Sequence, residues 1–260
     1  MGGVVRLSAT LGLLVYPLIE GREAGWPAWT LLMLAASPLA LLAFVRYERR
    51  LAHRGGAPLV DLSLFRELGL SIGVGMALLY YMLSSFYLTF SVYLQDGLHL
   101  TPLDAGLRTL PFAIGYFVAS FAAAHFMHWL GPRALTLGFA VRVLGFGSVI
   151  GAMMAARPTF VGMGLLVAGV GYGIVMPSVI KAVIGGIEPR HAGLASGIVI
   201  STFQIGATLG VAIIGGVFYG NLGAGHDVVA YTRAFVVALS CTVALLTVGG
   251  ILSFRLPRVH

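Results

Sequence analysis

Charged side chains are scarce in this sequence. Only 10% of its 260 residues are Asp, Glu, Lys or Arg, whereas 58% are hydrophobic. Soluble globular domains carry about 25% charged residues, so this composition excludes an ordinary soluble fold. Cysteine is almost absent as well. Cys241 stands alone, which excludes a disulfide within the chain and any metal site built on cysteines.

Long apolar runs are what the sequence has instead of charge. A helix needs about 20 apolar residues to cross a hydrocarbon core about 30 Å thick. Seven runs are long enough, and an eighth, residues 7–19, is short for a span. No basic leader or cleavage site marks this eighth run as a removable signal peptide. The sequence predicts an all-α polytopic membrane protein with about eight transmembrane helices. The seven clear runs are residues 27–44, 68–93, 106–130, 134–156, 159–184, 194–220 and 234–252.

The net charge of +7 indicates a membrane topology rather than a nucleic-acid surface. Cytoplasmic loops of membrane proteins are rich in Lys and Arg. With a cytoplasmic amino terminus and eight crossings, eleven basic residues lie inside and four outside, and Arg142 falls within a helix. We therefore expect a multi-pass protein of the inner (plasma) membrane with both termini cytoplasmic and no nucleic-acid partner. The inside set is Arg6, Arg46, Arg49, Arg50, Arg54, Arg66, Arg133, Lys181, Arg190, Arg255 and Arg258. The outside set is Arg22, Arg108, Arg157 and Arg233.

The longest polar interval, residues 46–67, reads RYERRLAHRGGAPLVDLSLFRE. Its five arginines, Gly-Gly pair and proline are typical of a connector. The sequence therefore predicts two transmembrane helices in residues 1–46, a basic cytoplasmic connector in 47–67 and a six-helix unit in 68–256.

Glycine is frequent inside the predicted spans, with 36 residues in the chain. Two small residues four positions apart let helix backbones approach closely in lipid, and three glycine pairs have this spacing. A further run of five glycines surrounds the sequence Gly-Val-Gly-Tyr-Gly. It predicts helix flexing or tight packing rather than a phosphate-binding loop, which would follow a strand. The pairs are Gly147 with Gly151, Gly193 with Gly197, and Gly206 with Gly210, and the run is Gly162, Gly164, Gly169, Gly171 and Gly173.

Four passages together indicate a family. They are PLVDLSLFR at 58–66, TPLDAGLRTLP at 101–111, LGPRALTLG at 130–138 and RHAGLASGIVISTFQIGATLGVA at 190–212. Over essentially its whole length the chain resembles the carboxy-terminal part of the fourteen-helix drug:proton antiporters of the major facilitator superfamily, the group of EmrB and QacA type exporters. The first two helices resemble the extra pair between the two halves, and the other six resemble the carboxy-terminal half.

The resemblance implies a partial or truncated multidrug efflux transporter. It implies proton-coupled export of small hydrophobic or cationic compounds across the lipid bilayer, with a missing amino-terminal half as partner. Two alternatives stay open. The chain could be an inactive remnant of a transporter, or a membrane interaction subunit that transports nothing.

Two family motifs are incomplete here. The signature between the second and third helices of a half aligns with Ala124, His128, Trp129, Gly131 and Arg133, and only the last two match it. Relatives carry Arg-Gln before the glycine series of the seventh helix, and this chain has Phe203-Gln204. These departures put the gating role of the signature in doubt.

Arg142 and Gln204 are the polar residues within predicted spans that suggest function. A charge at mid-bilayer costs about 2.5–3.5 kcal/mol on insertion scales, so such a residue is a functional candidate. Two interpretations of Arg142 stay open: it lines a cavity, or it snorkels toward the cytoplasmic surface about 12 Å away. Gln204 could bind a substrate or, as the favoured interpretation, a neighbouring helix.

Candidate gating residues also include Gln95 and Asp104 at the outer helix ends, and Gly131 and Arg133 of the signature. Asp104 follows a proline at an expected helix start, which favours an N-cap role over proton handling. No span contains a deep carboxylate that could carry protons. All nine carboxylates are expected in or beside loops: Glu20, Glu23, Glu48, Asp61, Glu67, Asp96, Asp104, Glu188 and Asp227.

The sequence does not predict an enzyme. The segment 194–197, Leu-Ala-Ser-Gly, is only similar to the Gly-x-Ser-Gly of intramembrane proteases, and every histidine is expected near a helix end or in a loop. His125 and His128 stand one turn apart, but a third metal ligand is not nearby. We therefore expect no catalytic residue, no cofactor and no metal.

Overall fold

Helices make up every regular element in the part of the chain that the computed structural model describes, namely residues 2–23, 27–54, 68–130, 133–184 and 192–254 with Gly25 and Gly56. The chain divides into two compact units, Met1–Ser71 and Ile72–His260. Each unit is described by itself. The predicted all-α fold is confirmed.

The smaller unit is a pair of helices, α1 (Gly2–Glu23) and α2 (Ala28–His53). They pack together, and the guanidinium carbon of Arg6 lies 3.8 Å from the ring centroid of Tyr47. Arg6 therefore packs across the helix pair.

Helix α2 extends past the predicted end of its span. No glycine or proline interrupts the sequence between Pro38 and Gly55, so the helix continues through the first residues of the expected connector to His53. Glu48, expected beside a loop, consequently lies within α2 and is buried. Residues 57–67, the last part of the predicted connector, lie outside the described residues.

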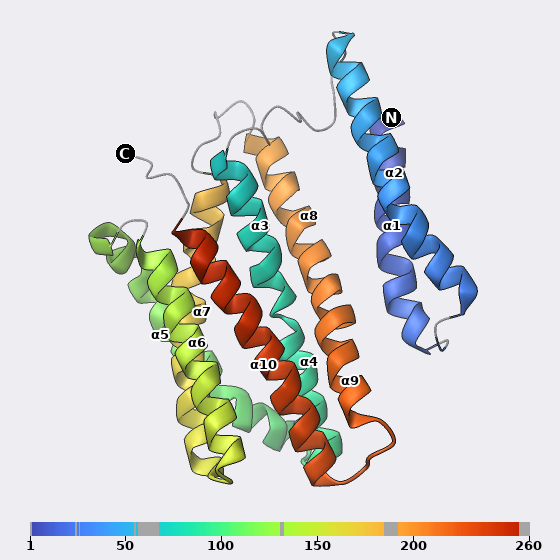
Figure 1. Ribbon diagram of the computed structural model, residues 1–260. Helices are drawn as coiled ribbons and strands as arrows, with labels where there is room; N and C mark the ends of the chain where they lie inside the picture. The colour runs from blue at the N-terminus through green and yellow to red at the C-terminus, as the bar shows by residue number, and fades with distance from the viewer. Residues whose placement is uncertain are drawn as a thin grey trace. The chain divides into compact units, whose positions relative to one another are not determined.

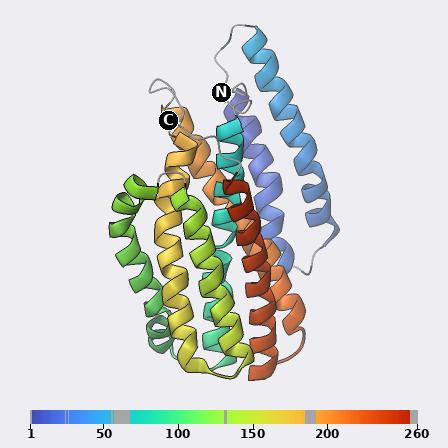
Figure 2. The same ribbon diagram turned by 60° about the vertical axis from the view of Figure 1, so that its left-hand side comes forward.

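The described residues of the larger unit form six passes. They alternate in direction (Figures 1 and 2). Length and apolar composition allow seven described helical stretches to cross a membrane, one in the smaller unit and six in the larger, which confirms the seven clear runs of the sequence. The expected eighth run is a shorter apolar stretch, Gly2–Leu18. The six passes are α3 (Leu68–Met82) with α4 (Ser85–Val92) and η2 (Tyr93–Gly97), α5 (Pro102–Leu130), α6 (Arg133–Met154), α7 (Pro158–Ile184), α8 (Ala192–Gly210) with η4 (Val211–Gly215) and α9 (Gly216–Leu222), and α10 (Val228–Ser253).

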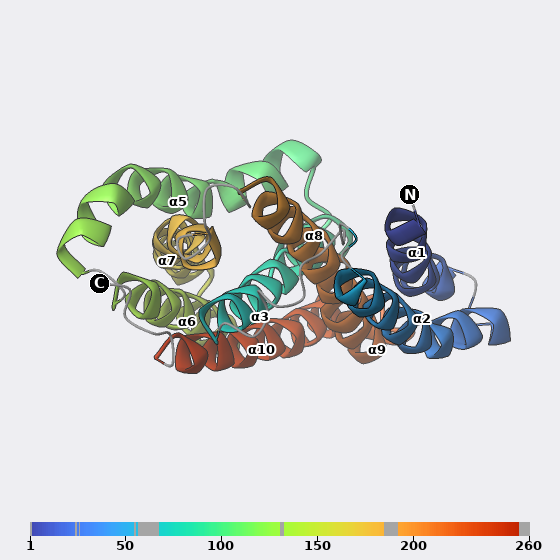
Figure 3. The same ribbon diagram turned by 90° about the horizontal axis from the view of Figure 1, so that it is seen from above.

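Helix α7 lies between α5 and α6 (Figure 3), and its glycines face both neighbours. A Cβ atom at Gly169 would meet the carbonyl oxygen of Phe112 on α5. One at Gly171 would meet the backbone nitrogen of Arg142 on α6. The glycine run therefore serves tight packing on two sides, which is one of its two predicted roles.

The predicted glycine pairs differ in whether they contact a neighbouring helix. Gly206 and Gly210 of α8 lie against backbone carbonyl oxygens of α3, so their predicted close approach is confirmed. Gly147 and Gly151 of α6 have no described atom within 4 Å of the position of a Cβ. The predicted close approach is therefore not seen at that pair.

The first pass of the larger unit is broken between α3 and α4. Leu83 donates its N–H to the Tyr80 carbonyl three residues back at 3.3 Å, and the Ser85 hydroxyl donates to the Met82 carbonyl at 2.8 Å. The same Met82 carbonyl lies against Gly210, where α8 gives way to the π-helical segment η4. Two neighbouring passes thus leave regular α-helical geometry at one crossing.

Aromatic side chains fill the centre of the larger unit. The ring of Phe86 on α4 lies 4.8 Å from that of Phe146 on α6 and 5.7 Å from that of Phe112 on α5. Phe235 of α10 joins the cluster through Phe90, with ring centroids 5.3 Å apart. Four helices therefore share one aromatic core.

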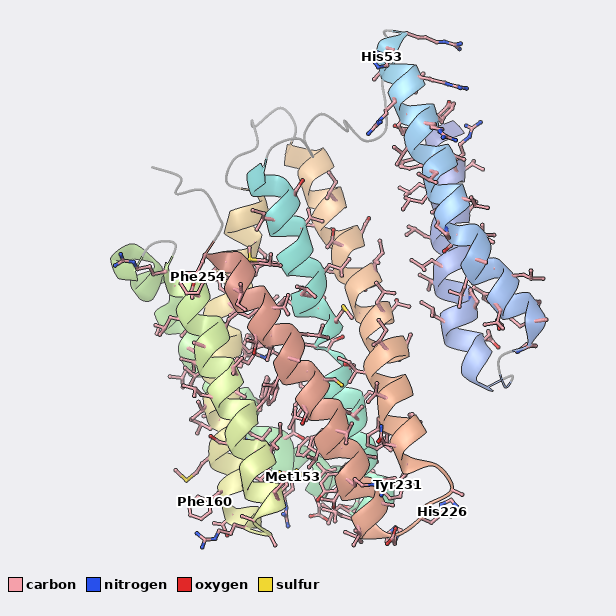
Figure 4. All side chains as sticks on the ribbon, viewed as in Figure 1. His53, Met153, Phe160, His226, Tyr231 and Phe254 are labelled. Atoms are coloured by element: carbon pink, nitrogen blue, oxygen red, sulfur yellow. The ribbon has the colours of Figure 1, made fainter. Side chains whose placement is uncertain are left out.

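Helix α10 closes the unit. Tyr231 lies in its first turn and His226 in the preceding loop, and Phe254 follows its last residue at the opposite end (Figure 4). The hydroxyls of Thr136 on α6 and Ser253 on α10 are 2.6 Å apart and form a hydrogen bond. This contact holds α10 against α6.

Candidate functional site

Arg142 is the most deeply buried charged side chain in the described part of the larger unit. Its exposed fraction is 0%, and its guanidinium nitrogens have no hydrogen-bond partner among the described residues. A snorkelling arginine would place these nitrogens at the surface. The geometry therefore favours the interior interpretation of the two that the sequence left open.

Helical periodicity explains why Arg142 points inward. It belongs to the buried stripe of α6, together with Phe139 one turn earlier and Phe146 one turn later. Gly171 of α7 lies directly against the Arg142 backbone, where any larger residue would collide. The side chain is therefore held by packing on a rigid helix pair.

Three aromatic rings surround the guanidinium. Its carbon lies 4.6 Å from the ring centroid of Tyr172 on α7, and 5.4 Å from those of Tyr80 on α3 and Phe146. Cation–π contacts contribute about 0.5–2 kcal/mol each. They stabilise the charge but leave the guanidinium N–H groups without hydrogen-bond acceptors, which is a costly arrangement in a low-dielectric interior.

Two of these rings belong to a longer series that crosses four helices. We define the aromatic row as Tyr116 on α5, Tyr172, Tyr80, Tyr81 on α3 and Phe203 on α8. Successive ring centroids along it are 5.1, 5.1, 5.5 and 3.7 Å apart. Tyr80 is buried, whereas the other four are partly exposed. The row therefore presents ring surface from α5, α7, α3 and α8, and two of its members, Tyr172 and Tyr80, contact the buried charge.

Hydrogen bonds fix part of the row. The Tyr80 hydroxyl donates to the backbone carbonyl of Tyr172 at 3.4 Å, which links α3 to α7. The Tyr116 hydroxyl donates to the sulfur of Met176 at 3.8 Å, which links α5 to α7. The tyrosines thus join three helices through their polar ends as well as their rings.

Gln204 stands next to this row on α8. Its side chain is exposed, and its backbone carbonyl accepts the Thr208 hydroxyl at 2.9 Å. The favoured role of Gln204 as a link between helices stays a prediction. The residue beside it, Phe203, makes the interhelical contact by stacking on Tyr81.

Asp104 supports a helix end, but it is not the N-cap itself. Thr101 precedes α5, and its hydroxyl oxygen accepts the Asp104 N–H at 3.2 Å and donates to the Asp104 carboxylate at 2.7 Å. This reciprocal arrangement resembles a capping box, with Thr101 as the cap. The sequence interpretation favoured Asp104 as the N-cap, whereas the helix already begins at Pro102, so the cap position falls on Thr101.

The remaining sequence candidates lie at helix ends. Gln95, in the π-helical η2, donates to the Ser91 hydroxyl at 2.6 Å. Arg133 is the first residue of α6 and is exposed. Gly131 lies outside the described residues. The structure places none of these described side chains in contact with Arg142.

Carboxylates are distant from the buried arginine as far as the larger unit is described. Asp96, Asp104 and Asp227 are exposed and lie at helix ends, and the Asp227 carboxylate caps α10 by accepting the Ala230 N–H at 3.2 Å. Arg142 therefore has no acidic partner among them.

Tyr116 and Tyr172 were not singled out by the sequence, although both belong to the row. One signal was available: Tyr172 is the only large residue in the Gly-Val-Gly-Tyr-Gly segment. Glycines on either side let the neighbouring backbones approach closely, which brings the ring between them against the adjacent helices.

Six alternating apolar passes in the described residues define a polytopic helical membrane protein. The Major Facilitator Superfamily profile matches residues 72–260, more than half of the chain. The chain belongs to the Major Facilitator Superfamily. The resemblance to this superfamily, inferred from the four sequence passages, is thereby confirmed, whereas the fourteen-helix group and the carboxy-terminal placement stay predictions.

Several relatives are named as exporters. The chain is 33% identical over 230 residues to the probable actinorhodin transporter of Streptomyces coelicolor, covering 85% of this chain and 39% of the relative. It is 32% identical over 232 residues to the drug efflux pump JefA of Mycobacterium tuberculosis, covering 85% and 44%. It is 32% identical over 224 residues to the cephamycin export protein CmcT of Amycolatopsis lactamdurans, covering 82% and 44%.

The matched region thus spans about two fifths of the length of these curated relatives. Their names describe transport, and the chain is accordingly not an enzyme, as the sequence predicts. The protein is a multi-pass membrane protein of a transporter family.

Proposed function

We propose that this chain forms one half of an efflux transporter, with the aromatic row as part of the wall along which small hydrophobic compounds move. The observation that carries this proposal is the row itself. Partly exposed rings from four helices are in contact near the middle of the larger unit, and binding sites for small molecules are lined mainly by apolar and aromatic side chains.

A second six-helix unit completes the transporter in this proposal. Transporters of this type bind substrate between two repeats that rock against each other. The larger unit described here has six passes, and the relatives are more than twice as long as the matched region. The chain by itself is therefore expected to be inert in transport.

Proton coupling would depend on the second unit. A proton carrier needs a titratable group inside the membrane whose protonation responds to the substrate. The described carboxylates of the larger unit are exposed at helix ends, and Arg142 keeps its positive charge. The acid that couples export to protons would then belong to the other half.

Of the hydrophobic and cationic compounds that the family resemblance implies, the site favours the hydrophobic ones. A cation at the aromatic row would be repelled by the buried guanidinium, which has no acidic neighbour among the described residues.

The basic loops further support a location in the inner (plasma) membrane with cytoplasmic termini.

Dye efflux from a strain deficient in efflux pumps tests this function. The chain would be expressed alone and together with the part of its Streptomyces coelicolor relative that lies outside the matched region. We expect export only from the pair, and we expect Phe203→Ala to reduce it severalfold. Leu144→Ala, at an exposed apolar position of α6, is the control and should leave export unchanged. Export by the chain alone would contradict the half-transporter proposal.

A further inference from the structure

We propose that Arg142 recognises an acidic group on the transported compound, so that the substrate class is an aromatic compound bearing a carboxylate or an ionised phenol. This inference rests on the proposed function, because it assigns a substrate class to the same aromatic row. It adds a charge to what the row alone would select.

The guanidinium of Arg142 has hydrogen-bond donors without acceptors among the described residues. Its planar fork of N–H donors matches a carboxylate, which can accept two parallel hydrogen bonds. In the described structure the Arg142 nitrogens are fully buried and donate to nothing. A carboxylate would satisfy these donors and would also balance the buried charge.

The three rings around the guanidinium, here called the cage, include no acid. Tyr172, Tyr80 and Phe146 provide ring faces but no carboxylate, and the described acids of the larger unit are exposed at helix ends. An arginine that served only to stabilise the fold would gain more from an acidic partner on a neighbouring helix. The cage instead leaves the guanidinium without an acidic partner among the described residues, and the transported compound would supply it.

Tyr172 provides the route by which a compound on the aromatic row would reach Arg142. Of the three rings, Tyr80 and Phe146 are at most 1% exposed, whereas Tyr172 is partly exposed. Tyr172 is also the ring nearest to the guanidinium carbon, at 4.6 Å. The surface of the aromatic row therefore comes closest to Arg142 at Tyr172, and a turn of this one side chain would connect them.

The aromatic row explains why the acidic group of the substrate should be attached to an aromatic ring. An aromatic body can stack along Tyr172, Tyr81 and Phe203, as these residues already stack with one another or with Tyr80. The acidic group of the same compound would then reach the guanidinium beside Tyr172. Two features of one ligand are read by two adjoining parts of one site.

Binding of a matched pair of probes to the full chain in lipid nanodiscs tests this inference. The pair is 2-naphthoate and its neutral analogue 2-naphthamide, with 2-naphthylmethylammonium as the cationic probe and empty nanodiscs as background. We expect 2-naphthoate to bind at least about tenfold more tightly than 2-naphthamide, because even a partly screened contact between two charges contributes that much to affinity. We expect the ammonium probe to bind most weakly.

Three variants identify the source of this preference. Arg142→Met should abolish it while 2-naphthamide binds as before, and Arg142→Lys should retain part of it. Arg157→Met removes an exposed arginine and should leave the preference intact. The comparison of probes on the unaltered chain does not depend on whether Arg142→Met folds.

The outcomes separate the two proposals. Equal binding of naphthoate and naphthamide, or a preference that survives in Arg142→Met, overturns the acidic-substrate inference and leaves the proposed function standing. Failure of all three probes to bind overturns both. A preference that disappears when the second six-helix unit is present would assign the guanidinium to a carboxylate of that unit, and would overturn the inference.

Discussion

The guanidinium carbon of Arg142 on α6 lies 4.6 Å from the ring centroid of Tyr172 on α7. The contact joins a fully buried charge to a ring that is partly exposed. It exists because the two helices approach closely at Gly171, whose missing side chain makes room for the Arg142 backbone. The charge, the ring and the glycine form one structural unit.

The ring of Tyr172 should matter more for stability than its hydroxyl. Tyr172→Leu removes the cation–π contact, so we expect the free energy of unfolding in detergent to fall by about 1–2 kcal/mol. Tyr172→Phe keeps the ring and should cost less than about 0.5 kcal/mol. Equal losses in the two variants would show that the ring does not stabilise the buried charge.

Gly169→Ala should destabilise the larger unit. Its new methyl group would meet the Phe112 carbonyl on α5, and such overpacking typically costs about 1–3 kcal/mol. Gly147→Ala, on α6, is the matched control because no described atom lies within 4 Å of its Cβ position. It should be neutral or slightly stabilising, since alanine favours helix more than glycine does. Thermal unfolding of both variants distinguishes them, and the same change in both would contradict the packing described here.

The crossing of α3 and α8 should be equally intolerant of size. Gly210→Ala directs a methyl group at the Met82 carbonyl beside the break in the first pass. We expect a loss of about 1–3 kcal/mol in the free energy of unfolding. Gly216→Ala lies six residues further along the same pass with open space around it and should have little effect. A tolerated Gly210→Ala would mean that the two passes separate easily at this point.

Asp104 should prove structural rather than catalytic in transport. Thr101→Ala removes the cap of α5 and should cost about 1 kcal/mol of stability. Asp104→Asn keeps a side-chain oxygen toward Thr101 and should leave export by the assembled transporter within about twofold of the unaltered rate, because the exposed carboxylate is bound to Thr101. Loss of export with unchanged stability would instead indicate proton handling.

The sequence predicts some features here because they follow from local composition. The spans follow from the length of apolar runs, and Arg142 stands out because it is a charge within one of them. Its surroundings could not be predicted, since Tyr80 and Tyr172 reach it from other helices. The spacing of Gly147 and Gly151 likewise predicted a close contact without indicating which face of α6 has a neighbour.

Helix ends were also difficult to predict. The span that was expected to end at residue 44 continues to His53, because an arginine-rich segment without glycine or proline remains helical whether or not it lies in lipid. The N-cap of α5 was displaced by three residues, from Asp104 to Thr101. Side-chain hydrogen bonds decide such boundaries, and composition does not record them.

Cysteine accessibility tests most directly whether the aromatic row borders a transport path. The single native cysteine is first replaced by Cys241→Ser, and Phe203→Cys on the row is compared with Leu144→Cys at an exposed apolar position of α6. Both variants would be treated, as the assembled transporter in native membranes, with a hydrophilic maleimide. We predict that the cysteine at position 203 is labelled, that an exported compound protects it, and that the cysteine at position 144 stays unlabelled in lipid. Labelling of position 144 without labelling of position 203 would contradict the account.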